Sequence, residues 1–217
     1  VANSTSAIVK ALIDKEIFEE YYIQVDRVNF SGKTREDQLQ LSETQQTAFE
    51  SIKKNFNQKE VCLLHGVTSS GKTEIYIKLI EDYVASGKQV LYLLPEIALT
   101  TQLVARLRDY FGNKVAVFHS KYSNNERVEV WQQVLAQSTK AQIVIGARSA
   151  LFLPFSNLGL VIVDEEHEQT FKQVDPSPRY HARDASIVLA NSHKAKVILG
   201  SATPSIETYF NAQSGKY

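Results

Sequence analysis

A glycine-rich loop between an apolar run and a helical pattern constrains this chain more than any other feature. Residues 66–73 read Gly-Val-Thr-Ser-Ser-Gly-Lys-Thr and match the pattern G-x-x-x-x-G-K-[ST]. Glycine lets the backbone curl until its N–H groups converge on phosphate oxygens, and the helix that follows points its positive end at the same place. The expected phosphate-binding residues are Gly66, Val67, Thr68, Ser69, Ser70, Gly71, Lys72 and Thr73.

From residue 41 onward, short apolar runs alternate with amphipathic stretches. Strands are predicted at residues 60–64, 89–93, 115–118, 142–145, 160–163 and 196–199. Helices are predicted at residues 44–56, 73–84, 99–111, 126–137, 183–190 and 205–212. Apolar strands of this length, separated by helices, favour a parallel sheet that is covered on both faces. The predicted fold over residues 41–217 is therefore α/β, with a parallel sheet between two layers of helices.

The first 40 residues have a different pattern. Residues 1–25 read as a helix followed by a strand, and residues 31–40 are polar and rich in turn formers. We expect residues 1–28 to be the end of another domain and residues 29–40 to be a linker. Because the chain begins at Val1 and has no methionine, we also expect it to be a fragment of a longer protein.

Composition narrows the possible partners and setting. The chain has 24 basic and 24 acidic residues, so any contact with nucleic acid must come from local clusters of charge. A single cysteine, Cys62, excludes a disulfide within the chain and predicts that it holds no zinc. We find no signal peptide and no apolar run of roughly 20 residues, the length that a bilayer requires. These features favour a cytoplasmic protein without a membrane partner.

A second motif lies where a buried strand meets a run of acids. Residues 160–167 read Leu-Val-Ile-Val-Asp-Glu-Glu-His. We expect Asp164 and Thr73 to hold Mg²⁺, Lys72 to bind the β and γ phosphates, and Glu165 to orient the attacking water. The alternative is a solvated turn. Ligands of open α/β sheets lie at the carboxyl ends of the strands, so we predict that Lys72, Asp164 and Glu165 form the catalytic centre of a P-loop ATPase.

Further segments resemble the superfamily 2 helicases. Residues 164–167 have the D-E-x-H form of motif II, and Ser201-Ala202-Thr203 is similar to motif III. Residues 94–100 and 146–150 resemble motifs Ia and Ib, and Gln45 stands where these proteins place a glutamine near the adenine. Residues 164–173, 179–184 and 200–205 together resemble the bacterial primosomal helicases, and this resemblance covers about residues 41–210.

The resemblance implies a RecA-like first motor lobe of a DNA helicase that moves 3′ to 5′ and restarts stalled forks. It implies ATP and Mg²⁺ as cofactors, forked and single-stranded DNA as partners, and other primosome and single-strand-binding proteins as further partners. It also implies that residues 1–28 end a winged-helix domain, and that zinc and an arginine finger belong to a second lobe outside the chain. We therefore expect nucleotide binding with negligible ATPase in isolation. A superfamily 2 clamp or remodelling factor that does not separate strands is the alternative.

The same resemblance implies a loop that senses single-stranded DNA and couples it to hydrolysis. The predicted coupling and DNA-contacting residues are Arg148, Glu166, His167, Phe171, Lys172, Arg179, Tyr180, His181, Arg183, Ser201 and Thr203. Rings and bases interleave between residues 171 and 183, as in surfaces that stack on bases and pair with phosphates. The alternative is an ordinary surface loop whose aromatic residues are buried in the core. Arg148 could instead form a salt bridge within the lobe, and His167 could be a core histidine.

Overall fold

The computed structural model describes Leu12, Lys15 and residues 39–68, 70–119 and 122–217. Apart from Leu12 and Lys15, the segment 1–25 with its predicted helix and strand lies outside the described residues, as do most of the linker predicted at residues 29–40 and Ser69 of the phosphate loop. The proposed domain limits at residues 28 and 40 therefore stay predictions.

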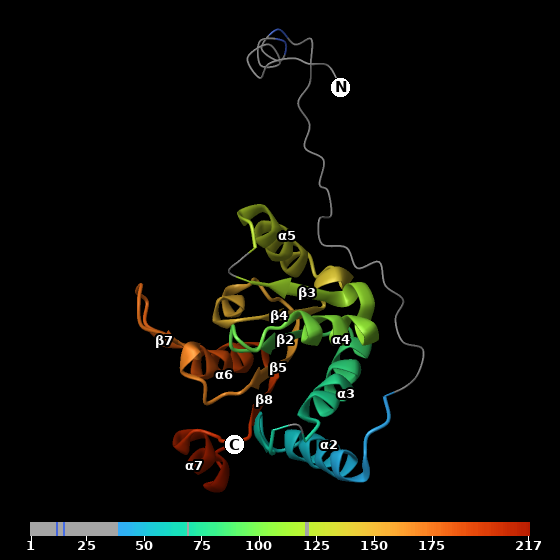
Figure 1. The fold of residues 1–217 in the computed structure, drawn as a ribbon, viewed down its shortest axis with the longest axis vertical. Coiled ribbons are helices and arrows are strands. Elements are labelled where there is room, and N and C mark those ends of the chain that lie inside the picture. Colours follow the sequence, from blue (N-terminus) through green and yellow to red (C-terminus); the bar gives the residue numbers. More distant parts are fainter. Residues whose placement is uncertain (1–11, 13–14, 16–38, 69, 120–121) are drawn as a thin grey trace.

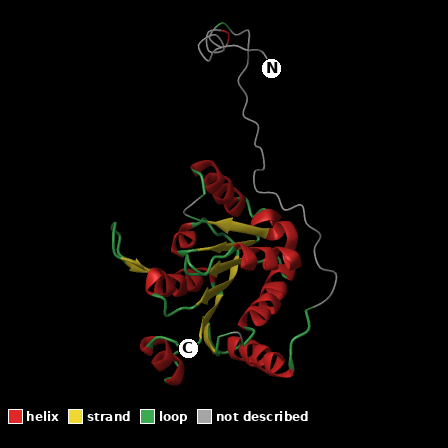
Figure 2. Ribbon diagram, viewed as in Figure 1, coloured by secondary structure: helices red, strands yellow, loops and turns green. Residues whose placement is uncertain are grey.

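Six parallel strands form one continuous sheet at the centre of the molecule (Figure 2). The strands are β1 (Val61–His65), β2 (Gln89–Leu93), β3 (Val115–Phe118), β4 (Ile143–Gly146), β5 (Leu158–Asp164) and β8 (Lys196–Ser201). Their order across the sheet is β1-β8-β5-β2-β4-β3, and every neighbouring pair is parallel. A separate antiparallel pair, β6 (Lys172–Gln173) and β7 (Tyr180–His181), was not predicted.

Helices cover both faces of the sheet, which confirms the predicted three layers (Figure 1). The α-helices are α2 (Glu43–Phe56), α3 (Lys72–Ala85), α4 (Thr101–Phe111), α5 (Asn124–Leu135), α6 (Ala182–His193) and α7 (Ile206–Gln213). The 3-10 helices are η1 (Gly112–Lys114), η2 (Thr139–Ala141), η3 (Arg148–Phe152) and η4 (Gln169–Phe171). Helices α2, α3 and α4 pack on one face, and α5 and α6 pack on the other. In the part of the chain that the structure describes, no helix has the length and apolarity that a membrane crossing requires.

Each central strand contributes side chains to two hydrophobic cores. In β5, Leu160 and Ile162 join the core beneath α3, whereas Val161 and Val163 join the core beneath α6. All four side chains are fully buried, and burying each contributes about 1.5–3 kcal/mol to folding. Burial on both faces is the reason why these strands are continuous apolar runs in the sequence rather than alternating ones.

Two helices have an end that lies two or three residues away from the predicted position, and the capping residues explain the difference. Helix α5 begins at Asn124, before the predicted start at Glu126, because Ser123 and Glu126 form a capping box. Helix α6 continues past the predicted end at Ala190 and stops at Lys194, which takes a left-handed φ of 55°.

The first prediction concerns Gln89, a buried polar residue at the start of β2. Its amide donates to the carbonyl of Val134 at 3.0 Å and accepts from the N–H groups of Ser156 and Asn157 at 3.0 and 2.9 Å. Replacing it by alanine leaves these groups without a partner, so we expect Gln89→Ala to lower the free energy of unfolding in urea by about 1–3 kcal/mol. The same change at exposed Gln58 should alter it by less than about 0.5 kcal/mol.

Candidate nucleotide-binding site

The three predicted motifs meet at the carboxyl edge of the sheet because β8 lies between β1 and β5. The phosphate loop follows β1, the acidic run follows β5, and residues 201–203 follow β8. Two main-chain hydrogen bonds join them: the N–H of Gly66 donates to Ser201 at 3.1 Å, and the N–H of Glu166 donates to Gly200 at 3.1 Å.

The phosphate loop is closed around its own lysine. Lys72 begins α3 and is only 8% exposed, and its Nζ donates to the carbonyl oxygens of Gly66 at 2.9 Å and Val67 at 3.4 Å. Gly71 precedes the helix with a left-handed φ of 80°, which favours glycine at this turn. The loop therefore gathers an ammonium group and the positive end of α3 in one place, as anion binding requires.

Gln45 lies against the same loop. Its Nε2 donates to the carbonyl of Gly71 at 3.4 Å, while its Oε1 accepts from the N–H of Ser42 in the capping box of α2. The side chain thus connects the start of α2 to the phosphate loop. Its predicted contact with the adenine stays a prediction.

A cavity of about 410 Å³ brings the phosphate loop and the acidic run together. It is lined by Thr68, Gly71, Lys72, Thr73, Glu74, Arg106, Asp164 and Glu165. The ammonium of Lys72 suits a phosphate chain, and hydroxyl and carboxylate oxygens on the same cavity suit Mg²⁺, because Mg²⁺ prefers oxygen ligands. Sequence reasoning missed the ion pair at the mouth of the cavity between Arg106 of α4 and Glu74 of α3, since neither residue belongs to a motif.

Two tyrosines surround the carboxylate of Asp164. The hydroxyl of Tyr76 donates to Oδ1 and that of Tyr92 donates to Oδ2, both at 3.1 Å. Burial raises the pKa of Asp164 and the charge of Glu165 adds to this, while the two tyrosine hydrogen bonds and Lys72 oppose it. Burial, together with the charge of Asp164, raises the pKa of both tyrosines well above its usual value. No sequence signal marked these tyrosines, since they read as apolar positions of α3 and β2.

His167 joins the acidic run to the segment after β8. Its Nδ1 lies 2.8 Å from Ser201 Oγ and 3.7 Å from Glu165 Oε2, and its Nε2 lies 3.3 Å from Thr203 Oγ1. The N–H of Thr203 also donates to Ser201 Oγ at 3.0 Å. The side chain of His167 is 30% exposed, so it lies at the surface of the site and not in the core.

A family model for the DEAD/DEAH box helicases matches residues 42–211, a range that contains all of these groups. The chain belongs to the DEAD/DEAH box helicase family. Membership of this family implies the use of ATP and Mg²⁺.

Curated relatives place the chain more closely within the family. It is 45% identical to the replication restart protein PriA of Bacillus subtilis, over 99% of this chain and 27% of that protein. It is 46% identical to PriA of Haemophilus influenzae, over 98% of this chain and 30% of that protein. The predicted resemblance to the bacterial primosomal helicases is therefore confirmed. The chain spans less than a third of the length of these relatives.

Solved structures confirm the predicted RecA-like fold. RecG bound to a three-way DNA junction superposes with a TM-score of 0.57 at 22% identity, covering 81% of this chain and 23% of that one. Mycobacterium smegmatis Lhr bound to single-stranded DNA and AMP-PNP superposes with a TM-score of 0.55 at 21% identity, covering 82% of this chain and 24% of that one.

Glu166 turns away from the cavity in this helicase domain and is fully buried. One carboxylate oxygen accepts from Arg183 Nη1 at 3.0 Å and from Thr208 Oγ1 at 2.8 Å, and the other accepts from the N–H of Ser205 at 2.7 Å. Glu166 and Arg183 were both predicted to couple or contact DNA. Burial leaves neither side chain free to contact DNA in this conformation, but the pair joins the end of β5 to α6 and α7.

The predicted stacking residue Phe171 needs correction, because its ring is buried in the core at 1% exposure. The alternative of a core aromatic is right for this residue. The exposed ring nearby is Phe152, which is 62% exposed and packs edge-on against Tyr180 with ring centroids 5.1 Å apart. Sequence reasoning missed Phe152, since it follows an apolar pair in η3 and resembles a core position.

Arg148 supports the segment that leads to the β6–β7 pair. Its Nη1 donates to the carbonyl oxygens of Thr170 at 3.3 Å and Lys172 at 3.2 Å, so its described contacts are to the main chain and not to a carboxylate. Lys172 and Arg179 are exposed on β6 and just before β7, where the chain projects beside α6 (Figure 1). His181 is half-buried, and burial together with the charge of Arg183 lowers its pKa.

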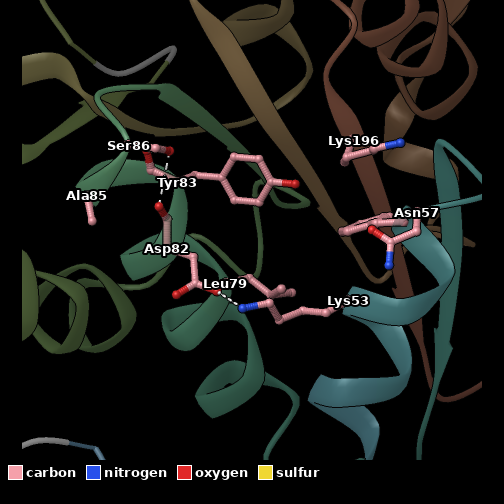
Figure 3. Close-up of a pocket in the computed structure, with 9 residues that line it drawn as sticks. Lys53, Asn57, Leu79, Asp82, Tyr83, Ala85, Ser86 and Lys196 are labelled. Carbon is pink, nitrogen blue, oxygen red and sulfur yellow. Dashed lines mark hydrogen bonds and ion pairs between the residues drawn. The ribbon is translucent and has the colours of Figure 1, made fainter.

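A second cavity of about 470 Å³ lies at the opposite, amino edge of the sheet (Figure 3). It contains none of the predicted site residues. Both of its lysines already have partners: Lys53 pairs with Asp82 at 2.8 Å, and Lys196 donates to the carbonyl of Lys59 at 3.0 Å. We assign it no role in nucleotide binding.

The second prediction compares two carboxylates that share Arg183. Glu166 is fully buried, whereas the side chain of Asp184, which accepts from Arg183 Nε at 2.7 Å, is 58% exposed. Glu166→Ala leaves the buried guanidinium without its buried partner, so we expect the free energy of unfolding to fall by about 3 kcal/mol or more. Asp184→Ala should change it by less than about 1 kcal/mol. If the two variants lose equal free energy of unfolding in urea denaturation, burial of Glu166 does not determine its contribution.

Proposed function

We propose that this chain is the ATP-binding first motor lobe of a bacterial, cytoplasmic DNA helicase that moves 3′ to 5′ and restarts stalled replication forks. The observation that carries the proposal is the single cavity shared by Lys72, Thr73, Asp164 and Glu165, which His167 links to the segment after β8. The similarity to PriA proteins supports the assignment to replication restart. Forked and single-stranded DNA are the proposed substrates.

The roles of the cavity residues follow from their chemistry. Lys72 would bind the β and γ phosphates, and Thr73 and Asp164 would hold Mg²⁺, which neutralises charge on the phosphates when it is bound. Glu165 would orient and polarise the attacking water. Its left-handed φ of 51°, uncommon for a residue with a side chain, sends Glu165 to the cavity and the next residue, Glu166, into the core.

A short chain of contacts would connect the proposed DNA surface to the carboxylate of Glu165. Strand β7 ends at His181, and Arg183 lies in the first turn of α6 and pairs with Glu166. Glu166 is the next residue along the chain from Glu165. We propose that binding of DNA to the β6–β7 pair shifts α6 and that the Arg183–Glu166 pair transmits this shift to Glu165, while Ser201 and Thr203 transmit it through His167.

The complete helicase would need further domains. An arginine finger and zinc-binding cysteines would come from a second motor lobe, and residues 1–28 would end a winged-helix DNA-binding domain. The chain by itself would bind nucleotide with negligible ATPase, because phosphoryl transfer needs charge stabilisation from all sides. Primosome and single-strand-binding proteins are proposed as further partners. Within the described residues, no feature favours the alternative of a clamp or remodelling factor that does not separate strands.

The third prediction tests helicase activity in the full-length parent protein. Lys72→Ala removes the ammonium that would bind the phosphates, so we expect ATP-dependent strand displacement to fall by about 100-fold or more. Lys78→Ala, on the same helix but paired with Glu81 away from the cavity, should leave the rate within about two-fold. A wild-type protein that binds DNA and hydrolyses ATP without displacing a strand would favour the clamp.

The fourth prediction tests the DNA surface on the same protein. Arg179→Ala removes an exposed cation beside β7, so we expect weaker binding to single-stranded DNA and a slope of log K against log salt that is smaller by about 0.7. Nucleotide affinity should not change. The control is Lys114→Ala, which removes an exposed cation just before the start of β3, at the amino edge of the sheet. It should leave the slope unchanged. An unchanged slope in the Arg179 variant contradicts the proposed surface.

A further inference from the structure

The carboxylate of Asp164 is held by a pair of buried hydroxyls that the proposed mechanism does not use. Tyr76 comes from the second turn of α3 and Tyr92 from near the end of β2, and both side chains are fully buried. Each donates to a different oxygen of Asp164, at 3.1 Å. Their rings pack edge-on with centroids 5.6 Å apart, so the two tyrosines contact each other as well as Asp164.

Packing alone does not explain these hydroxyls. The surrounding core contains Ile, Leu and Val side chains from α3, β2 and β5, where phenylalanine would fill the same space without burying a polar atom. The neighbouring strand makes room for one of them: Gly200 pairs with Asp164 in the sheet, and a Cβ at Gly200 would overlap the hydroxyl of Tyr76. Elements from three parts of the sequence therefore converge on this one carboxylate.

The hydrogen bonds make the two carboxylate oxygens unequal. Oδ1 accepts from Tyr76 and also from the N–H of Glu165 at 3.1 Å, whereas Oδ2 accepts, among the residues that the structure describes, from Tyr92 alone. A carboxylate oxygen has about two acceptor positions, so Oδ1 is filled and Oδ2 keeps one position free. These hydrogen bonds therefore restrict the rotation of the Asp164 carboxylate and distinguish its two oxygens.

We propose that Tyr76 and Tyr92 are positioning residues that fix the rotation of the Asp164 carboxylate and present Oδ2 to Mg²⁺ of the bound nucleotide. This rests on the proposed function, in which Asp164 holds that ion. Groups that hydrogen-bond to a metal ligand orient it, and removing them weakens metal binding. The tyrosines act through Asp164 and do not touch the nucleotide.

The experiment measures how much Mg²⁺ strengthens nucleotide binding to the 217-residue chain. Calorimetric titrations with AMP-PNP in Mg²⁺ and in EDTA give a ratio of the two dissociation constants. We expect Tyr76→Phe and Tyr92→Phe each to lower this ratio by about 10-fold, with little change of affinity in EDTA. Tyr83→Phe is the matched control: Tyr83 lies on the same helix, lines the cavity at the amino edge, and should leave the ratio unchanged.

Asp164→Asn separates this inference from the proposed function. It should lower the ratio towards one, and adding Tyr92→Phe to it should cause no further fall, because the tyrosine acts through the carboxylate. If Asp164→Asn lowers the ratio and neither tyrosine variant does, the positioning role is wrong and the proposed function stands. If Asp164→Asn also leaves the ratio unchanged, the metal role of Asp164 fails, and the positioning role fails with it.

Melting curves guard against a purely structural effect. A phenylalanine variant that unfolds below the titration temperature is replaced by the variant at the other tyrosine. Loss of folding in both, or a Tyr92→Phe effect that is equally large in the Asp164→Asn background, overturns the positioning role in favour of a packing role.

Discussion

The pairing of β8 with β1 on one side and β5 on the other is the constraint on which the site depends. Parallel strands end at one edge, so this order places the phosphate loop, residues 201–203 and the acidic run within main-chain hydrogen-bonding distance of one another. Apolar contacts on both faces hold these strands in place. The cavity at their ends is therefore formed by residues from widely separated parts of the chain.

The carboxylates of the acidic run point in two directions. Asp164 and Glu165 line the cavity, whereas Glu166 is buried against Arg183, Ser205 and Thr208. A buried carboxylate is costly without partners, and these partners lie on α6 and before and within α7. The same short segment thus lines the proposed nucleotide cavity and also contacts the helices that lead to the proposed DNA surface. A rearrangement of α6 would disturb hydrogen bonds one residue away from Glu165.

Much of the nucleotide site could be predicted from sequence because local geometry decides it. A strand, a glycine turn and a helix suffice to gather N–H groups, and Lys72 and Thr73 have fixed places at the start of that helix. The segment that is proposed to couple DNA was harder to predict. Phe171 and Tyr180 look alike in the sequence, but one is in the core and the other packs against exposed Phe152. Which ring faces solvent depends on tertiary packing, and η4 and β7 are too short to show a periodic pattern that would mark a buried face.

The sequence by itself determined the alternation of strands and helices, the family, and the motif residues Lys72, Thr73, Asp164 and Glu165 of the cavity, because each follows from a motif or a period within a few residues of chain. Only the tertiary structure decided that Tyr76 and Tyr92 hold Asp164, that Glu166 and Arg183 form a buried pair, and that Arg148 supports main-chain carbonyls. These contacts join residues that are 17 to 88 positions apart in the sequence. Their partners are chosen by the strand order and by burial, which no local pattern records.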